Sequence, residues 1–303
     1  MTAGHRGAPR RSQAIVAPIL GMHRSGTSMF TRAVNLMGLN LGRPLMAPQA
    51  DNPKGFWENE FFYHVNMRLL HALGCQVSGY GRVDGLLRIP DACARVERSA
   101  ANLKAIEDYV DAQFGRSLVW GWKDPRSVLL FPFWLPVLVE LGFRRVRPTV
   151  IARHPFAVVR SMARRTDLAG LAPALGCTVE ALALEMWTAY NHILLDVCDA
   201  TDCFVSVHEW LVDTPRARAE LERGAAYLGL EAEEGPLAAA LDWLDPSAVH
   251  HREPAPLDLP GADEALVLYE DLCARARSQG AAWRQARPRL TAAQSAPTAT
   301  TSS

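Results

Sequence analysis

The sequence has no excess of charge of either sign, since its 303 residues include 32 lysines and arginines against 32 aspartates and glutamates. A chain without a net field does not attract nucleic acid or an anionic membrane as a whole. We therefore expect no nucleic-acid partner, and any anion site must be built by residues that cluster locally. Apolar residues make up 49% of the chain, which is ample for a globular core.

Paired cysteines are also lacking. The six cysteines are scattered, without a C-x-x-C pair and without a histidine at zinc-finger spacing. This pattern argues against a metal site, so we expect none, and it favours a reducing compartment.

Long hydrophobic runs are absent as well. The most apolar run, residues 128–139, contains two prolines and is well short of the roughly 20 residues that span a bilayer. The basic start of the chain is followed only by a short apolar stretch that Pro18 interrupts, unlike a secretory signal. We expect a cytoplasmic protein without a membrane span.

Short apolar runs and longer helical patterns alternate along the chain. Strands are predicted at 13–20, 117–122, 148–153 and 203–208, and helices at 27–38, 57–73, 91–114, 126–141, 155–166, 179–199, 214–229 and 263–278. This alternation predicts an α/β fold with one mostly parallel sheet and helices on both faces. We expect a single domain over residues 13–284, a flexible basic N-terminus (1–12) and a disordered Thr/Ser-rich tail (285–303).

The stretch GMHRSGTS, residues 21–28, has the glycine spacing of a phosphate-binding loop and follows a predicted strand. Gly21 and Gly26 allow a tight turn whose N–H groups, with the N-terminus of the next helix, converge on an anion. Thr27 stands where such a loop carries its lysine. Arg24 can supply the missing charge, and Thr27 and Ser28 can add hydroxyl donors. The alternative is a glycine turn with a surface arginine.

A second candidate anion site is RHPFAVVRS, residues 153–161. Arg153 is predicted at the carboxyl end of a strand, where open parallel sheets bind ligands, and Pro155 suits the first turn of the following helix. Ser161 lies about two turns in. Arg153 as an exposed strand end and Ser161 as a helix-bonded hydroxyl remain open. Arg160, Arg164 and Arg165 are either a solvated face or ligand contacts.

With these two elements the sequence resembles the sulfotransferases that use 3′-phosphoadenosine 5′-phosphosulfate (PAPS), in the motif style of the bacterial and tyrosylprotein branches, over about residues 14–230. The resemblance implies a P-loop NTPase-like fold. It also implies that the loop binds the 5′-phosphosulfate and that the pair Arg153 and Ser161 binds the 3′-phosphate; the loop residues concerned are Arg24, Ser25, Gly26, Thr27 and Ser28. The G-x-x-G-x-x-K segment that closes the donor pocket in the cytosolic branch is missing, and SAVHHREP (247–254) is a candidate flap.

Lys123 lies in a K-D-P segment, GWKDPRS, which in the family implies a position beside the transferred group. A positioned ammonium stabilises the charge that grows on the leaving oxygen, so we assign a catalytic role to Lys123, with Arg24 beside it. Asp124 either positions the lysine or caps the next helix. Arg126 faces either the acceptor or solvent.

The catalytic base expected for the acceptor hydroxyl is Glu58, in NPKGFWE. At about 100° per residue it shares a helical face with Phe62 and Val65, so it points inward. The family resemblance also implies an acidic base here; a structural ion pair is the alternative. Likewise, His208 and Glu209 either line the adenosine region or cap a helix.

The resemblance therefore implies transfer of a sulfuryl group from PAPS to an acceptor hydroxyl, on a carbohydrate, a glycolipid or a small metabolite. Two other classes remain open: a P-loop kinase or nucleotide hydrolase, against which Thr27 argues, and a non-catalytic nucleotide-binding module. The sequence does not indicate an oligomeric state.

Overall fold

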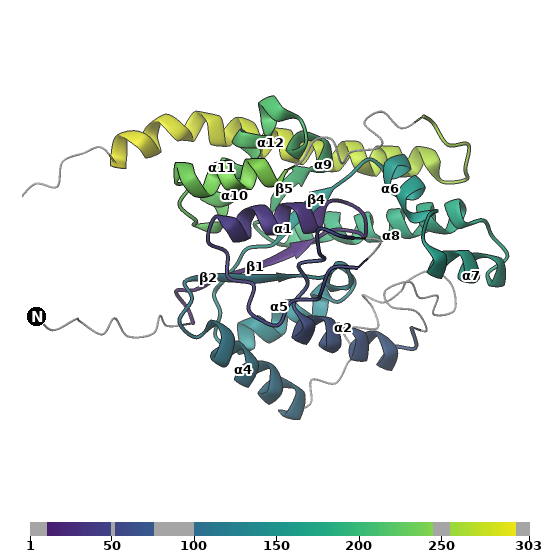
Figure 1. Cartoon of the computed structure of the whole chain (residues 1–303), viewed down its shortest axis with the longest axis horizontal. Coiled ribbons are helices and arrows are strands. Elements are labelled where there is room, and N and C mark those ends of the chain that lie inside the picture. The colour runs from purple at the N-terminus through teal and green to yellow at the C-terminus, as the bar shows by residue number, and fades with distance from the viewer. Residues whose placement is uncertain (1–10, 50–51, 76–99, 245–254, 295–303) are drawn as a thin grey trace, which may run out of the picture.

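The computed structural model describes residues 11–49, 52–75, 100–244 and 255–294. One sheet forms its centre (Figure 1), with the strands β1 (Ile15–Leu20), β2 (Val119–Lys123), β3 (Arg145–Val146), β4 (Thr149–Ala152) and β5 (Phe204–Val207). The order is β2-β1-β4-β5, β3 also pairs with β1, and every pairing is parallel. Because all strands run the same way, their carboxyl ends meet at one edge of the sheet.

The central strand β1 is buried along its whole length. Its side chains alternate between two cores: Ala17 and Ile19 belong to one hydrophobic cluster, whereas Val16 and Leu20 belong to the other. This period of two, on a strand that is apolar on both sides, is what a sheet covered on both faces requires.

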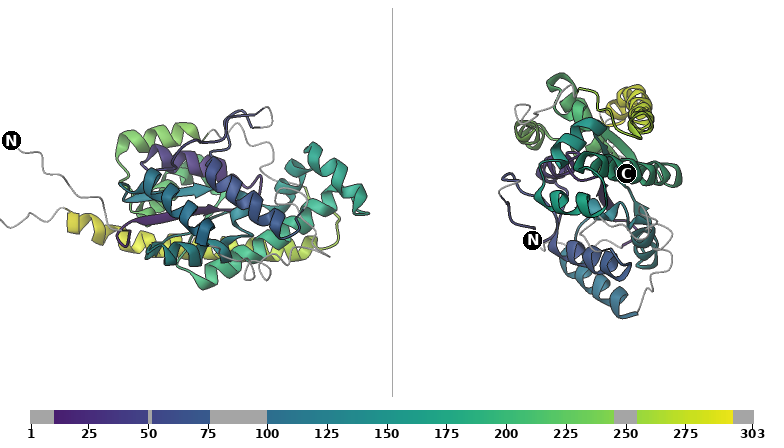
Figure 2. Two further views of the ribbon diagram at one scale, coloured as in Figure 1. Left: turned by 90° about the horizontal axis from the view of Figure 1, so that it is seen from below. Right: turned by 90° about the vertical axis from the view of Figure 1, so that its right-hand side faces the viewer.

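Helices cover both faces of the sheet (Figure 2). The smaller core lies under α1 (Thr27–Leu36), α10 (Thr214–Leu228) and α11 (Glu234–Trp243). The larger core lies under α2 (Glu60–Ala72), α4 (Ala100–Phe114), α5 (Phe131–Glu140), α6 (Pro155–Met162), α8 (Val179–Ala200) and α12 (Ala262–Gln294). The remaining described helices are η1 (Pro125–Ser127), α7 (Thr166–Ala174) and α9 (His208–Leu211). The predicted parallel α/β architecture with helices on both faces is confirmed.

One close approach and one proline shape the centre of the sheet. A Cβ on Gly121 of β2 would lie 2.0 Å from the carbonyl oxygen of Ala17 on β1, so no larger residue fits there without moving one strand. Beyond Val146, Pro148 separates β3 from β4, because proline has no N–H to donate. The carbonyl of Pro148 instead accepts the N–H of Phe204.

Several boundaries differ from the expectation. The helix expected at 126–141 is divided into η1 and α5, and the one expected at 57–73 begins only at Glu60. The helix α12 continues to Gln294, so it extends into the tail that was expected to be disordered from residue 285. The alanine, arginine, leucine and glutamine residues of this part of the chain favour helix. The candidate flap 247–254, residues 1–10 of the expected N-terminal segment 1–12, and residues 91–99 of the helix expected at 91–114 lie outside the described residues.

Within the described ranges, no single helix is long and apolar enough to cross a membrane. One pair of helices, Leu168–Ala174 and Val179–Ala200, reaches that length and composition only when taken together across a bend of 95°.

Candidate active site

The glycine loop leaves the carboxyl end of β1 and leads directly into α1. Gly21 has no room for a side chain, since a Cβ there would lie 2.6 Å from Cγ2 of Thr27 and 2.7 Å from the carbonyl oxygen of Ile151. Gly26 has a φ of 86°, in the region that favours glycine, and its open side faces the ring of His208. The two glycines that define the motif are therefore required by the backbone path.

The N-terminus of α1 is built to receive an anion. Gly26 is its N-cap residue and provides no side-chain hydrogen bond to the first turn. The first N–H groups of a helix have no partner inside the helix, and the helix dipole favours negative charge at this end. Ser25 and Thr27 are buried beside this terminus. The loop is thus an anion cradle in geometry as well as in sequence.

Lys123 brings to the loop the lysine that the loop itself lacks. It is the last residue of β2, next to β1, and its side chain is only 3% exposed. Its ammonium donates to Oγ of Ser28 (3.0 Å), to the carbonyl oxygen of Phe56 (3.1 Å) and to Oε1 of Glu58 (2.7 Å). We call Ser28, Glu58 and Lys123 the lysine pole of the site.

Glu58 is held between two cations. Its Oε1 accepts from Lys123 and its Oε2 accepts from Nη2 of Arg126 at 2.9 Å, with the carboxylate 6% exposed. The burial expected of Glu58 is present, but its cause differs, because Glu58 precedes the helix and Asn59 caps it by accepting the N–H of Phe61. The ion pair weighed as an alternative to the catalytic base is present. It does not exclude the base, because a carboxylate has about four lone-pair sites and two are used here.

Arg126 faces neither of the two expected directions. It is 6% exposed and pairs with both Asp124 and Glu58, and its guanidinium lies 4.5 Å from the ring centre of Tyr63. Burial opposes its charge, but the carboxylates of Asp124 and Glu58 outweigh burial and raise the pKa of Arg126. Asp124 also accepts the N–H of Arg126 at the start of η1, so its capping interpretation is confirmed.

The second predicted anion element meets the loop directly. Nε of Arg24 donates to Oγ of Ser161 at 2.9 Å, and Nη1 of Arg153 donates to the carbonyl oxygen of Arg24 at 2.8 Å. We call Arg24, Arg153 and Ser161 the arginine pole. Arg24 has a φ of 65°, which directs the chain so that its side chain reaches α6. The guanidinium expected beside Lys123 therefore lies at the arginine pole.

Arg153 is buried among groups that oppose and groups that support its charge. Burial lowers the pKa of Arg153. The carboxylate of Glu209 raises it, and the charge of Arg24 lowers it further. Its Nε is buried without a hydrogen-bond partner among the described residues. A buried arginine N–H that lacks an acceptor marks a place where an anionic ligand oxygen would be stabilised.

His208 and Glu209 follow β5 and lie next to Arg153. The ring nitrogens of His208 are buried without a hydrogen-bond partner in the described part of the chain. Burial, and after it the charge of Arg153, lower the pKa of His208 well below its usual range. Glu209 accepts from the N–H of His154 and from the Tyr269 hydroxyl, and burial raises its pKa. Neither residue acts as a helix N-cap through its side chain, since Val207 occupies that position for α9.

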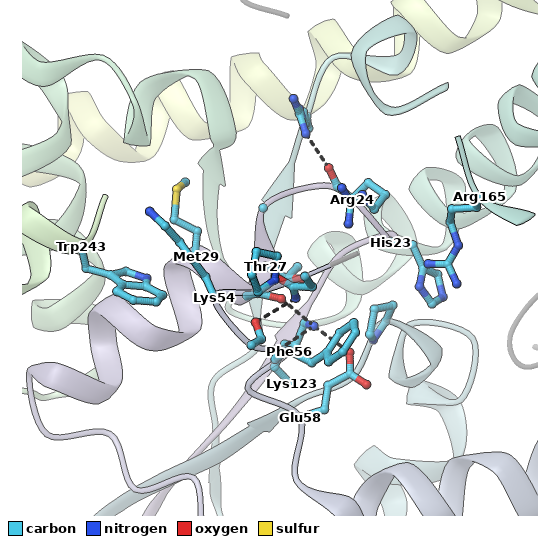
Figure 3. A pocket seen from close by; sticks show the side chains of 17 residues that line it. His23, Arg24, Thr27, Met29, Lys54, Phe56, Glu58, Lys123, Arg165 and Trp243 are labelled. Atoms are coloured by element: carbon cyan, nitrogen blue, oxygen red, sulfur yellow. Dashed lines mark hydrogen bonds and ion pairs between the residues drawn. The ribbon is translucent and has the colours of Figure 1, made fainter. Parts of the chain in front are cut away.

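Both poles open into one cavity of about 400 Å³ (Figure 3). Its walls come from the loop and α1, the segment before α2, the ends of β2 and β4, and α11; they are His23, Arg24, Gly26, Thr27, Ser28, Met29, Asn52, Pro53, Lys54, Gly55, Phe56, Glu58, Lys123, Pro125, Arg153, Arg165 and Trp243. Of the predicted site residues, Ser25 and Ser161 are not among these lining residues. The volume is within the range of about 300–1,000 Å³ that small-molecule sites occupy.

Sequence reasoning missed several residues of the cavity. His23 is buried within it, and burial, followed by the charges of Arg126, Arg165, Lys123 and Arg24, lowers its pKa well below the usual value. Trp243 lies at the other end, where Lys54 is 5.4 Å from its ring centre. His23 lies within the loop motif GMHRSGTS, so the sequence could have indicated it as a site residue. No motif marked Trp243. Of the three arginines near α6, only Arg165 lines the cavity, while Arg160 donates to the carbonyl oxygen of Ala255.

Among the residues that the structure describes, no group of three or more histidine, cysteine, aspartate or glutamate side chains is arranged to hold a metal ion.

Comparisons with known proteins find chains of similar fold among solved structures. No family model matches the sequence, and no curated protein matches it. Among solved structures, the chain is similar to the sulfotransferase domain of the olefin synthase from Synechococcus PCC 7002, with 19% identity and a TM-score of 0.50, covering 88% of this chain and 98% of that one.

Two further structures align with the chain. They are the sulfotransferase domain of the curacin biosynthetic pathway (16% identity, TM-score 0.48, 86% of this chain and 98% of that one) and the sulfotransferase STF1 from Mycobacterium tuberculosis H37Rv (11%, 0.43, 84% and 76%). At 19% identity, the match to the olefin synthase domain establishes the fold alone. The protein thus has the parallel α/β fold of a sulfotransferase domain. The sulfotransferase resemblance that its motifs indicate is confirmed at the level of the fold.

Proposed function

We propose that the protein is a sulfotransferase that moves a sulfuryl group from PAPS to an acceptor hydroxyl. The observation that carries the proposal is the lysine pole, in which Lys123 joins the anion loop at Ser28 to the buried carboxylate of Glu58. A cation between an anion cradle and a candidate base is the arrangement that transfer of a charged group to a hydroxyl needs.

The donor fits features of this chain at both of its charged ends. The uncapped N-terminus of α1, with Thr27 and Ser28, suits the 5′-phosphosulfate. The unpartnered Nε of Arg153, close to Arg24 and Ser161, suits the 3′-phosphate. The two poles face one cavity, so a single adenosine-based molecule can contact both. Bound there, the donor would supply the activated sulfuryl group.

Lys123 stabilises the negative charge that develops on the oxygen leaving the sulfur. It is held by three hydrogen bonds before any ligand arrives, so little reorganisation is needed at the moment of reaction. Glu58 accepts the proton of the acceptor hydroxyl at a lone pair that its two ion pairs leave open. Arg126 keeps the carboxylate oriented, because it binds the oxygen that Lys123 does not.

The proposed acceptors are a carbohydrate, a glycolipid or a small metabolite, and the proposed compartment is the cytoplasm. The charge stabilisation assigned to Lys123, Arg24 and the loop N–H groups requires no metal ion. The scattered cysteines, without a C-x-x-C pair, are what support the compartment.

The test uses purified full-length protein, radiolabelled PAPS and a panel of hydroxyl acceptors, with adenosine 3′,5′-bisphosphate as the product inhibitor. We expect label in an acceptor and inhibition by the bisphosphate. Magnesium-dependent turnover of ATP, without bisphosphate binding, would instead establish the kinase or hydrolase class. Bisphosphate binding without transfer to any acceptor, and unchanged by Glu58→Gln or Lys123→Met, would establish a binding module.

A further inference from the structure

Two cysteines that are unremarkable in the sequence come together far from the proposed active site. Cys198 lies in the last turn of α8 and Cys203 directly precedes β5, so the end of the helix and a short connection separate them. Both are free thiols and both line a second cavity of about 230 Å³. This cavity is at the amino end of β5, whereas the candidate active site lies at the carboxyl ends of the strands.

The two thiols are in contact and are chemically unequal. The hydrogen bond from Cys198 lowers the pKa of Cys203; burial opposes this, and the guanidinium of Arg275 supports it. The same hydrogen bond and burial raise the pKa of Cys198. A thiolate is the nucleophile in disulfide exchange, so the pair contains one attacking sulfur and one neighbour in reach to resolve the adduct.

The surroundings hold the pair in this position. Arg275 forms an ion pair of 2.7 Å with Asp199, which ties α12 to the last turn of α8. Gln279 donates to the carbonyl oxygen of Cys203 at 2.7 Å and accepts the N–H of Val205 at 2.9 Å. Cys198 is half-buried and Cys203 is buried, and both line the same cavity, through which a reagent would approach the sulfurs.

We propose that Cys198 and Cys203 are a redox-active pair that a low-molecular-weight disulfide, of the glutathione disulfide type, oxidises to an intramolecular disulfide. The Cys203 thiolate attacks one sulfur of the reagent, a Cys203–glutathione bond forms, and the first glutathione leaves as a thiolate. Cys198 then attacks the Cys203 sulfur and the second glutathione leaves. Two protein thiols are oxidised, one glutathione disulfide is reduced to two glutathione molecules, and the two thiol protons pass to them.

The closed disulfide would fasten α8 to the start of β5 covalently at a point that now depends on the Arg275–Asp199 ion pair and on Gln279. Because β5 leads to His208 and Glu209 at its other end, the pair lies on the same strand as part of the candidate active site without contacting it. This is a modification site that stands independently of the proposed function.

The experiment incubates the full-length protein with glutathione disulfide, blocks the remaining thiols by alkylation and measures the intact mass and the modified peptides. We expect the wild type to lose about 2 Da and to regain it with dithiothreitol. Cys198→Ser is expected to retain a glutathione adduct on Cys203, because its resolving thiol is missing. Cys203→Ser is expected to form neither the disulfide nor an adduct at Cys198. Cys177→Ser, the matched control, should behave as the wild type.

Three results would overturn the proposal: no mass loss in the wild type, a mass loss that persists in Cys198→Ser, or a covalent dimer as the main product. Differential alkylation of the wild type reports on the pair even if a variant fails to fold, since the free thiol of Cys177, just before α8, serves as its internal reference. Loss of alkylation at Cys198 and Cys203, with Cys177 still alkylated, is the expected pattern.

Discussion

Arg153 offers the sharpest test of how the donor would be held. It makes one hydrogen bond to the loop backbone at Arg24 and leaves a buried Nε without a partner in the described structure. If this N–H and its neighbours bind the 3′-phosphate, Arg153→Ala removes charge-assisted hydrogen bonds worth about 1.5–3 kcal/mol. That loss corresponds to about 10- to 150-fold weaker binding of adenosine 3′,5′-bisphosphate.

The assay compares two ligands that differ only at the 3′ position. Isothermal titration measures the Kd of the bisphosphate and of adenosine 5′-phosphate for the wild type and for Arg153→Ala. The bisphosphate should lose affinity by the stated factor, and adenosine 5′-phosphate should change by less than about threefold. Arg160→Ala is the matched control, because Arg160 lies close in sequence, in α6, and donates to the carbonyl oxygen of Ala255.

An equal loss for both ligands would refute this reasoning. It would mean that Arg153 acts through its hydrogen bond to Arg24, by supporting the loop, and does not recognise the 3′-phosphate. A wild type that binds both ligands with the same Kd would refute it as well.

Three further predictions concern other parts of the site. Lys123→Met should lower kcat for sulfuryl transfer by about 10²–10³, as for removal of one oxyanion donor. The control Lys104→Met, which changes an exposed lysine of α4, should leave kcat unchanged; a kcat of Lys123→Met equal to that of the wild type would exclude Lys123 from the reaction. Gly26→Ala should abolish bisphosphate binding and destabilise the protein by about 1–2 kcal/mol, because its φ is 86° and the new Cβ meets His208; unchanged thermal unfolding would contradict this. The pKa of His208 is lowered in the folded protein, so between that value and about 6.5 the unfolded chain binds more protons. The free energy of unfolding therefore falls as the pH falls, by up to about 1.4 kcal/mol per pH unit. Urea unfolding across this range should show a weaker dependence of this free energy on pH for His208→Gln, and an identical dependence would refute the assignment.

The fold was largely predictable because its strands are short apolar runs separated by helical patterns. All four predicted strands are present, and β1 is apolar throughout because it is covered on both faces. The missed elements are the helices α7 and α11, of nine and ten residues, and two short ones: β3 has two residues, and α9 is a single turn. Pairing partners and a neighbouring strand, which a one-dimensional pattern does not contain, decide such elements.

The residues of the candidate site were predictable where a motif marked them, and their partners were not. Glu58 was expected to be buried from a helical phase, yet it lies before the helix and owes its burial to Lys123 and Arg126. The two anion elements were expected to bind opposite ends of one ligand, and the motifs did not indicate that Arg24 donates to Ser161. Side-chain direction at a residue with positive φ depends on the turn around it. The pairing of Cys198 with Cys203 likewise follows from the path between α8 and β5.

The cation of the anion loop comes from β2, so its position depends on how far apart two strands lie. Gly121, two residues before Lys123, touches the backbone of β1 so closely that an added methyl group would force the strands apart. The ammonium would then shift relative to Ser28 while the loop kept its own shape. In this architecture the electrostatics of the loop can be tuned by changes in the floor of the sheet, without any substitution in the loop itself.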